Sequence, residues 1–349
     1  MTRSFKRFSA LIAAGLGIWL AAIPACAQSI QELASYQGAD RQQRLEELAK
    51  KEGSLTLYMN IPRVYSDRFV QPFEKKYGIK VNIWRARSEL TLKRVIDEAR
   101  AGRHAVDVVN SISPPMEALR REHLLESIDS PSHKQLKPYA VPKHREWVSM
   151  RELVFVQAYN TQSVKKDELP RTYQDLLAPR WKGNVGIEAG DQEWVSSVIE
   201  DMGTEKGRKF FRDLADNGLR VVTGHPVLAN AVVSGEVPLG LTIYNYDALH
   251  WKEQNAPIDW FAIEPAITIQ DGIAIARQAP HPHAALLFYE YMLGETAQSV
   301  LAEINFMPTN VQVEPPLKDI KLKVLDPAVL LDDYEASEKQ FQSLLIDRK

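Results

Sequence analysis

The chain has 349 residues, with 43 Lys and Arg against 45 Asp and Glu, and a formal net charge of −2. This balance gives no general basic surface, so it argues against a nucleic-acid partner. A chain of this length normally exceeds one hydrophobic core, which favours two domains.

The N-terminal residues have the pattern of an export signal. A basic start is followed by an apolar run that stops at Ala25-Cys26-Ala27, a small-residue cleavage site. We therefore expect a signal peptide over residues 1–27 and a periplasmic mature chain. Cys26 is the only cysteine, so cleavage after Ala27 would leave no disulfide and no thiolate metal site. A lipoprotein would instead keep Cys26 as its lipid-modified first residue.

Strand-like and helix-like patterns alternate along the first part of the mature chain. We expect strands at 54–60, 79–85 and 105–111, and helices at 66–78, 88–102 and 114–127. Ser88 is a candidate N-cap and Gly78 a candidate C-cap for these helices. Alternation of this kind with short loops predicts a parallel wound sheet.

A second α/β set follows an extended run at 151–161. We expect strands at 184–188, 219–224 and 237–246, helices at 193–218 and 225–236, another extended run at 266–276, two helices around Gly294 and a terminal helix at 332–346. The extended stretches Val154–Asn160 and Ile267–Ile275 bracket this set. We expect them to be two strands that cross between lobes.

The predicted fold class is therefore α/β, with two wound lobes joined by two crossover strands. Lobe one would comprise residues 29–155 plus 270–349, and lobe two residues 156–269. Two lobes on paired crossovers form a hinge that can close around a ligand.

Several stretches in a fixed order carry a resemblance to a known family. They are "GSLTLY", "FEKKYGIKV", "LKRVIDEARAGRHAVDVV", "VQAYNTQSVKKDELPRTYQDLLAPRWKGNVGI", "VVSGEVPLGL", "PHPHAALLFYEYML" and "INFMPTN". In this order they resemble the type II periplasmic substrate-binding proteins of ABC importers, in the subgroup that includes ferric-ion-binding proteins.

The resemblance implies a Venus-flytrap protein that binds one solute between its lobes and hands it to an ABC permease in the inner membrane. It implies no enzymatic activity and no cofactor. The transported solute would be Fe(III) or a small anion such as a phosphonate or a sugar phosphate. We also expect a monomer.

Ligands of open α/β sheets bind beyond the carboxyl ends of the strands, and this rule selects candidate contacts on each lobe. On lobe one they are Asn60, Arg85, Arg87, Ser88 and Ser111. On lobe two they are Glu188, Trp194, His225, Tyr244 and Tyr246.

Ser88 would cap its helix while the free N–H groups behind it receive an anionic group. Arg85 and Arg87 add fork-shaped donors suited to carboxylate or phosphate. Together they predict an anion-accepting wall on lobe one, whereas an ordinary cap with solvated arginines is the plain alternative.

Tyr244 and Tyr246 face the same way if their strand continues through Asn245, because side chains alternate along a strand. The resemblance implies tyrosine ligands for Fe(III) from this region, although the order here is Tyr-Asn-Tyr rather than two adjacent tyrosines. Metal coordination by Tyr244 and Tyr246 applies only if the solute is ferric ion. Stacking and hydrogen bonding to an organic anion is the alternative.

Two other functions stay open at this point. One is an exported enzyme on the same scaffold, such as a hydrolase or a thiamine-degrading enzyme, which the lack of G-x-S-x-G and H-E-x-x-H motifs argues against. The other is a ligand sensor or chemoreceptor partner, which would share the binding chemistry.

Overall fold

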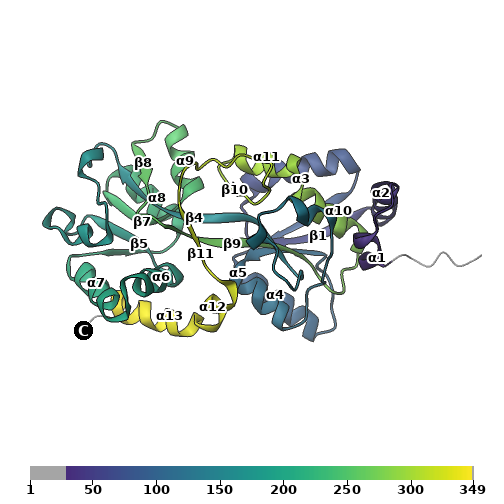
Figure 1. The fold of residues 1–349 in the computed structure, drawn as a ribbon, viewed down its shortest axis with the longest axis horizontal. Coiled ribbons are helices and arrows are strands. Elements are labelled where there is room, and N and C mark those ends of the chain that lie inside the picture. Colours follow the sequence, from purple (N-terminus) through teal and green to yellow (C-terminus); the bar gives the residue numbers. More distant parts are fainter. Residues whose placement is uncertain (1–28, 348–349) are drawn as a thin grey trace, which may run out of the picture.

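The computed structural model describes residues 29–347, which form two lobes joined by two long strands (Figure 1). The predicted signal peptide at 1–27 lies outside the described residues. Within 29–347, no helix combines the length and apolarity that a membrane crossing requires.

Lobe one is a parallel sheet covered by helices. Its strands are β1 (Ser54–Met59), β2 (Lys80–Arg85) and β3 (Val108–Ile112), in the order β2-β1-β3. Its helices are α1 (Ile30–Ser35), α2 (Arg41–Glu52), α3 (Arg63–Tyr77), α4 (Ser88–Arg100), α5 (Ser113–Arg121), α10 (Pro282–Leu293) and α11 (Glu295–Glu303). Phe69, Phe73 and Phe288 lie in its core. The strands and helices expected over this region are confirmed, except that the helix expected over 114–127 ends at Arg121. The C-cap of α3 is Gly78, whose φ of 71° suits a glycine.

The two predicted crossover strands are confirmed as β4 (Val148–Asn160) and β9 (Ala266–Ile275), which pair antiparallel. On the lobe-one side β9 pairs with β3, and the short β10 (Met307–Pro308) pairs with β4. On the lobe-two side β4 continues into pairing with β7 and β8. Both strands are buried along their whole length, including polar residues such as Arg151 of β4 and Asp271 of β9.

Lobe two contains a second wound set. Its strands are β5 (Val185–Glu188), β6 (Arg220–Val222), β7 (Leu239–Tyr244) and β8 (Ile258–Phe261), and its helices are α6 (Gln192–Met202), α7 (Thr204–Asp216), α8 (His225–Ser234) and α9 (Asn245–Glu253). The single helix expected over 193–218 is wrong. It breaks at Gly203, whose φ is 81°, and α7 folds back closely on α6.

The C-terminal segment corrects the predicted lobe boundaries. The strand β11 (Leu322–Val324) pairs with β9, and α12 (Pro327–Asp332) packs against α5 of lobe one. Then α13 (Tyr334–Phe341) crosses to α6, and Phe341, Leu344 and Leu345 join the lobe-two core. Residues 334–346 therefore belong to lobe two, whereas the sequence placed the whole of 270–349 in lobe one. In Figure 1 the helix α13 runs beside α6 at the lobe-two end, and the apolar side chains of Phe341, Leu344 and Leu345 pack in the same core as those of α6 and α7.

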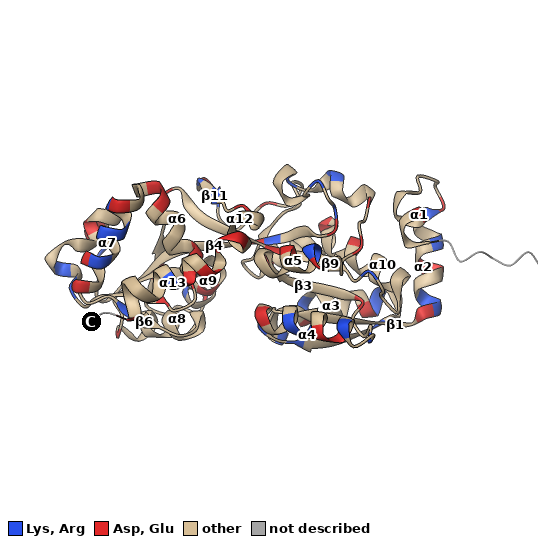
Figure 2. Cartoon of the chain, turned by 90° about the horizontal axis from the view of Figure 1, so that it is seen from below, with Lys and Arg blue, Asp and Glu red and all other residues tan. Residues whose placement is uncertain are grey.

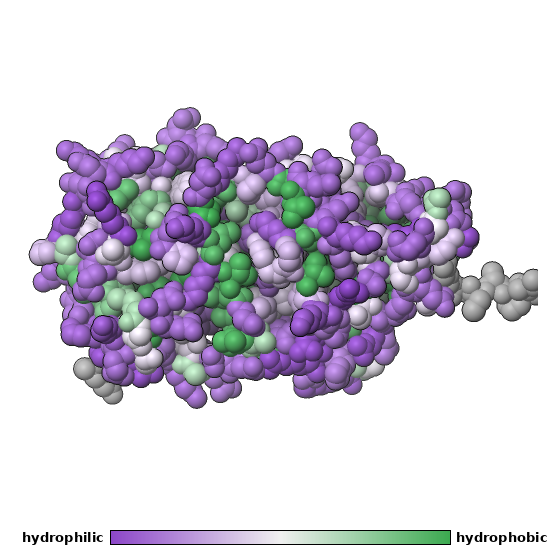
Figure 3. All heavy atoms as spheres, in the orientation of Figure 1, coloured by the Kyte–Doolittle hydropathy of each residue, from purple (hydrophilic) through white to green (hydrophobic). Residues whose placement is uncertain are grey.

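Surface character differs between the ends and the middle of the molecule. Outer helices such as α4 and α7 carry charged residues of both signs (Figure 2). In the space-filling view hydrophilic residues cover both ends of this face, and hydrophobic residues gather near its middle, where the lobes meet (Figure 3). The lobes thus meet over a less polar region than the one they present outward.

Candidate functional site

A cleft of about 1190 Å³ lies between the lobes and is also lined by the C-terminal segment. The predicted contact residues that line it are Asn60, Arg85, Arg87, Ser88, Glu188, His225, Tyr244 and Tyr246. The strand-end rule therefore brought together residues from five separate strand ends and helix starts.

Two predicted contact residues lie elsewhere. Trp194 is fully buried in the lobe-two core, with its ring 5.5 Å from that of Tyr173, because α6 turns this residue toward the sheet. Ser111 is fully buried within β3, beside β9, and does not line the cleft. Both were chosen for their place in the sequence, which does not fix the direction of a side chain.

Lobe two presents an acidic cluster to the cleft. Glu188, Asp191 and His225 each offer a ligand atom within 4.8 Å of the others. The Glu188 carboxylate ends β5 and accepts backbone N–H groups from Gly190, at 2.5 Å, and Gly224, at 2.8 Å. These donors fix the carboxylate in place while Asp191 keeps one oxygen, Oδ2, with no partner among the described residues. The arrangement matches a cation site.

The protonation of this cluster follows from crowding of like charge. Burial, together with Glu188 and Glu193, raises the pKa of Asp191 well above its usual range. Burial and the neighbouring Glu188 and Glu89 raise the pKa of Glu193 to about 7. Burial, with Arg87 across the cleft, lowers the pKa of His225 to about 3 and leaves a neutral imidazole. Without a cation, burial and like charge therefore favour the protonated form of Asp191.

Tyr244 lies against this cluster, and Tyr246 stacks on Tyr244. Their rings stack with centroids 5.6 Å apart and an interplanar angle of 20°, and the Tyr244 ring centroid lies 4.0 Å from that of His225. The strand does not continue through Asn245 as expected: β7 ends at Tyr244 and α9 begins at Asn245, whose side chain donates to the Asn305 carbonyl. The first turn of α9, rather than strand alternation, places the two phenols together.

Lobe one presents arginines and a helix start. Arg85 and Arg87 are exposed, and Arg87 forms a 3.7 Å ion pair with Glu89. Ser88 is the first residue of α4 rather than its N-cap, which is Arg87; the Ser88 hydroxyl instead accepts from the Asn60 side-chain amide at 3.3 Å. This wall can receive an anion, as predicted, but without the predicted serine cap.

The floor of the cleft contains an ion pair that sequence analysis missed. Arg151 of β4 donates to Asp271 of β9 at 2.5 and 2.6 Å, and the same carboxylate accepts from the side-chain amides of Asn60 and Asn110. Arg151 is 3% exposed, and its Nη1 has no hydrogen-bond partner within the described chain. Its guanidinium carbon lies 4.0 Å from the centroid of the Phe306 ring. An alternating polar residue in a strand gave no signal of this pairing.

Comparison with known proteins identifies the family. The family described as bacterial extracellular solute-binding protein matches residues 106–331. The chain belongs to this family. Its inter-lobe cleft is therefore a solute-binding cleft, and the expected solute-binding function is confirmed.

The similar proteins support one fold class, but they do not identify one solute. The chain is 24% identical to the Fe(3+)-binding periplasmic protein of Serratia marcescens over 280 residues, which cover 75% of this chain and 82% of that protein. Iron-bound HitA from Pseudomonas aeruginosa has a TM-score of 0.74 and 23% identity, covering 83% of this chain and 99% of that one. AfuA from Actinobacillus pleuropneumoniae, with fructose-6-phosphate bound, has a TM-score of 0.72 and 22% identity, covering 85% and 100%. These likenesses confirm the two-lobed α/β fold class, but the two structures hold different solutes.

Proposed function

We propose that the protein is the periplasmic solute-binding component of an ABC importer, and that its solute is ferric ion accompanied by an oxygen-rich anionic chelator. One observation carries this proposal. The two walls of a single cleft have opposite charge preference: acids and phenols on lobe two, arginines and a helix start on lobe one.

The lobe-two wall favours a highly charged cation. Glu188, Asp191, Tyr244 and Tyr246 offer carboxylate and phenol oxygens, which are hard donors that suit a hard ion such as Fe(III). A cation also relieves the repulsion that raises the pKa of Asp191, because a bound metal ion becomes the largest local charge. The relative from Serratia marcescens is named for Fe(3+) binding, which supports the same choice.

The lobe-one wall and the size of the cleft favour a chelated ion over a bare one. A cleft of about 1190 Å³ is far larger than one ion and its protein ligands need. Arg85 and Arg87 can hold the free carboxylates of a chelator such as citrate in bidentate geometry. A sugar phosphate alone would satisfy these arginines but would leave the acids of lobe two facing an anion.

Titration with ferric citrate, followed by visible absorption, tests the solute. We expect a tyrosinate-to-iron charge-transfer band in the wild type, and Tyr244→Phe should weaken iron binding by more than about 100-fold. We expect this size of effect because mutation of residues that only orient metal ligands already lowers metal affinity by about 10- to 100-fold. Tyr77→Phe, a phenol in the lobe-one core, is the matched control and should keep the band.

A competing outcome would redirect the assignment. If ferric citrate gives no band, while a sugar phosphate binds and Arg87→Ala removes that binding, the solute is a phosphate-bearing anion. If small-angle scattering shows no compaction with either solute, closure of the lobes around a ligand is wrong as well.

The remaining features of the proposal have their own tests. N-terminal sequencing of exported protein should begin at Gln28 if residues 1–27 are a cleaved signal, and at Cys26 if the chain is a lipoprotein. Sedimentation should give a monomer. Recovery of ferric citrate unchanged after long incubation would support binding over catalysis, and pull-down of an ABC permease would separate an importer component from a sensor.

A further inference from the structure

The C-terminal segment forms a third wall of the cleft, in addition to the walls of the two lobes. Its lining residues are Val329, Leu330, Asp333, Tyr334, Ser337 and Gln340. The segment is attached at both ends: α12 packs on α5 of lobe one and α13 packs on α6 of lobe two. An ion pair between Arg121 and Asp332 adds to the first attachment. Any change in the angle between the lobes therefore moves this wall.

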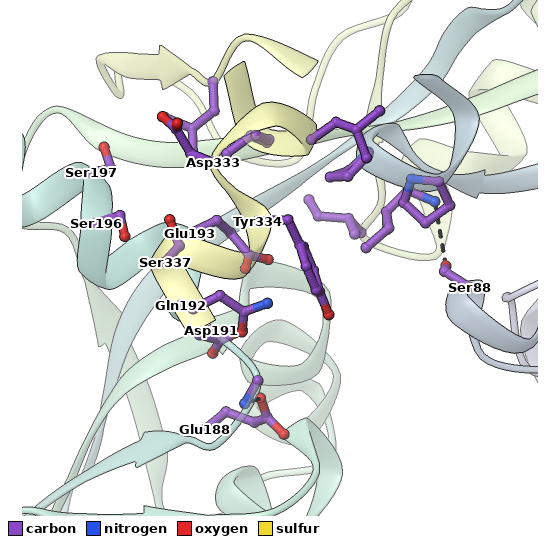
Figure 4. A pocket seen from close by; sticks show the side chains of 18 of the residues that line it. Ser88, Glu188, Asp191, Gln192, Glu193, Ser196, Ser197, Asp333, Tyr334 and Ser337 are labelled. Atoms are coloured by element: carbon purple, nitrogen blue, oxygen red, sulfur yellow. Dashed lines mark hydrogen bonds between the residues drawn. The ribbon is translucent and has the colours of Figure 1, made fainter. Parts of the chain in front are cut away.

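Tyr334 is the most conspicuous side chain of this wall. It is the first residue of α13, and 38% of its surface is exposed although it lines a cleft. Figure 4 shows its ring extending from α13 into the space between the lobe-two residues Asp191 and Gln192 on one side and Ser88 of lobe one on the other. An aromatic ring placed there has apolar area to bury, and its hydroxyl, although it interacts with the Gln192 side chain, still has a proton to donate, which is the usual form of a ligand contact.

The surroundings of the Tyr334 hydroxyl decide what it can contact. Burial and nearby Glu338, Glu89 and Glu193 raise the pKa of this phenol. It therefore stays protonated and acts as a hydrogen-bond donor rather than as a phenolate ligand for iron. Glu89 belongs to lobe one and Glu193 to lobe two, so the hydroxyl lies within electrostatic reach of both lobes at once.

We propose that Tyr334 is a specificity-determining residue that contacts the organic part of the chelator. Its ring covers the carbon skeleton, and its hydroxyl donates to a carboxylate oxygen of the ligand. This inference rests on the proposed function. It assigns the iron to Tyr244 and Tyr246 and the chelator to the space between them and Tyr334. The third wall then discriminates between ferric complexes by the anion that accompanies the iron.

Affinity for iron with two different accompanying anions tests this role. Iron is supplied with citrate or with inorganic phosphate, which has neither a carbon skeleton nor a carboxylate for Tyr334 to contact. Tyr334→Phe should weaken binding with citrate by about 10-fold, since a hydrogen bond to a charged group is lost. Tyr334→Ala should cost about a further 3- to 10-fold through loss of the ring. Binding with phosphate should change by less than about 2-fold in both variants, because no contact with the third wall exists to be lost.

Each other outcome overturns the inference. Equal weakening with citrate and phosphate would show that Tyr334 only supports the fold of the cleft, and unchanged binding with citrate would show that it touches no ligand. An iron band in the wild type that Tyr244→Phe removes, together with unaffected Tyr334 variants, would overturn the role of Tyr334 alone. Absence of any iron band in the wild type would overturn the proposed function too. Thermal unfolding within about 2 °C of the wild type identifies variants that fold normally, and Tyr334→Phe keeps the test valid if Tyr334→Ala does not.

Discussion

Iron binding to this cleft should release protons, because its phenol ligands are protonated when no cation is present. Burial, together with Asp191 and Tyr246, raises the pKa of Tyr244 well above 10, and burial together with Asp247 raises that of Tyr246. Neither phenol ionises at neutral pH without a cation. Coordination of Fe(III) by both phenolates must therefore expel both protons, since metal ligands bind in their deprotonated form.

The magnitude follows from proton linkage. Each proton released makes the binding constant change about tenfold per pH unit. The two phenols alone predict a fall of about 100-fold in iron affinity when the pH drops from 7.5 to 6.5, and a proton displaced from Asp191, whose pKa is also raised, would add to this fall. Tyr244→Phe removes one phenol proton, so its iron affinity should fall about 10-fold less than that of the wild type over the same interval.

Competition titrations at a series of pH values measure these slopes. The difference between the wild type and Tyr244→Phe is the decisive quantity, because the pH-dependent chemistry of ferric citrate in solution is common to both. Calorimetry in two buffers with different ionisation enthalpies gives the proton count independently. Identical slopes for the wild type, Tyr244→Phe and Tyr246→Phe would refute phenolate coordination, even if iron binds.

Three further changes test the scaffold around the cleft. Arg151→Met leaves the buried Asp271 carboxylate without its cation and should lower the free energy of unfolding by about 3–5 kcal/mol; adding Asp271→Asn should recover most of this in urea unfolding. Burial, then Arg145, lowers the pKa of His133 from 6.5 to about 4, so its stabilising effect is complete above pH 6.5 and is lost as the pH falls toward 4. Between pH 6.5 and pH 4, the free energy of unfolding of His133→Gln should therefore fall by on the order of 2 kcal/mol less than that of the wild type. Thermal unfolding at a series of pH values measures this difference. Gly207→Ala should cost about 1–3 kcal/mol, because its Cβ would lie 2.5 Å from the α6 backbone, whereas alanine in place of the glycine that precedes α11 meets ordinary contacts and should be near neutral.

The fold was largely predictable because its signals are local. The strands and helices of lobe one follow apolar periodicity with caps such as Gly78, and the crossovers β4 and β9 are long extended runs rich in β-branched and aromatic residues. The break at Gly203 was not predictable from periodicity, since α6 and α7 together read as one amphipathic helix. It depends on how closely the two helices pack at Gly207.

The candidate site was predictable only in part. The rule for strand ends found both walls, because the carboxyl ends of strands meet at the cleft whatever side chains they carry. The rule wrongly placed Trp194 in the cleft, because the direction of its side chain depends on which face of α6 carries it. It missed Arg151, whose partner Asp271 lies 120 residues away, and Tyr334, which reaches the cleft only because the C-terminal segment recrosses between the lobes. Such long-range contacts leave no pattern in a single sequence.

The distribution of charge in the cleft links solute choice to closure of the lobes. The charges of Arg151 and Asp271 on the cleft floor cancel each other, so the floor does little to discriminate between a cation and an anion. Its one contribution among the described residues is Nη1 of Arg151, which has no hydrogen-bond partner there. The walls do discriminate, and in opposite directions. A bare cation would engage only the acids of lobe two, and a bare anion only Arg85 and Arg87 of lobe one, so neither would gain much from bringing the walls together. On the proposed function, a ferric chelate would favour the closed state, because only there would its metal and its free carboxylates meet their partners at the same time.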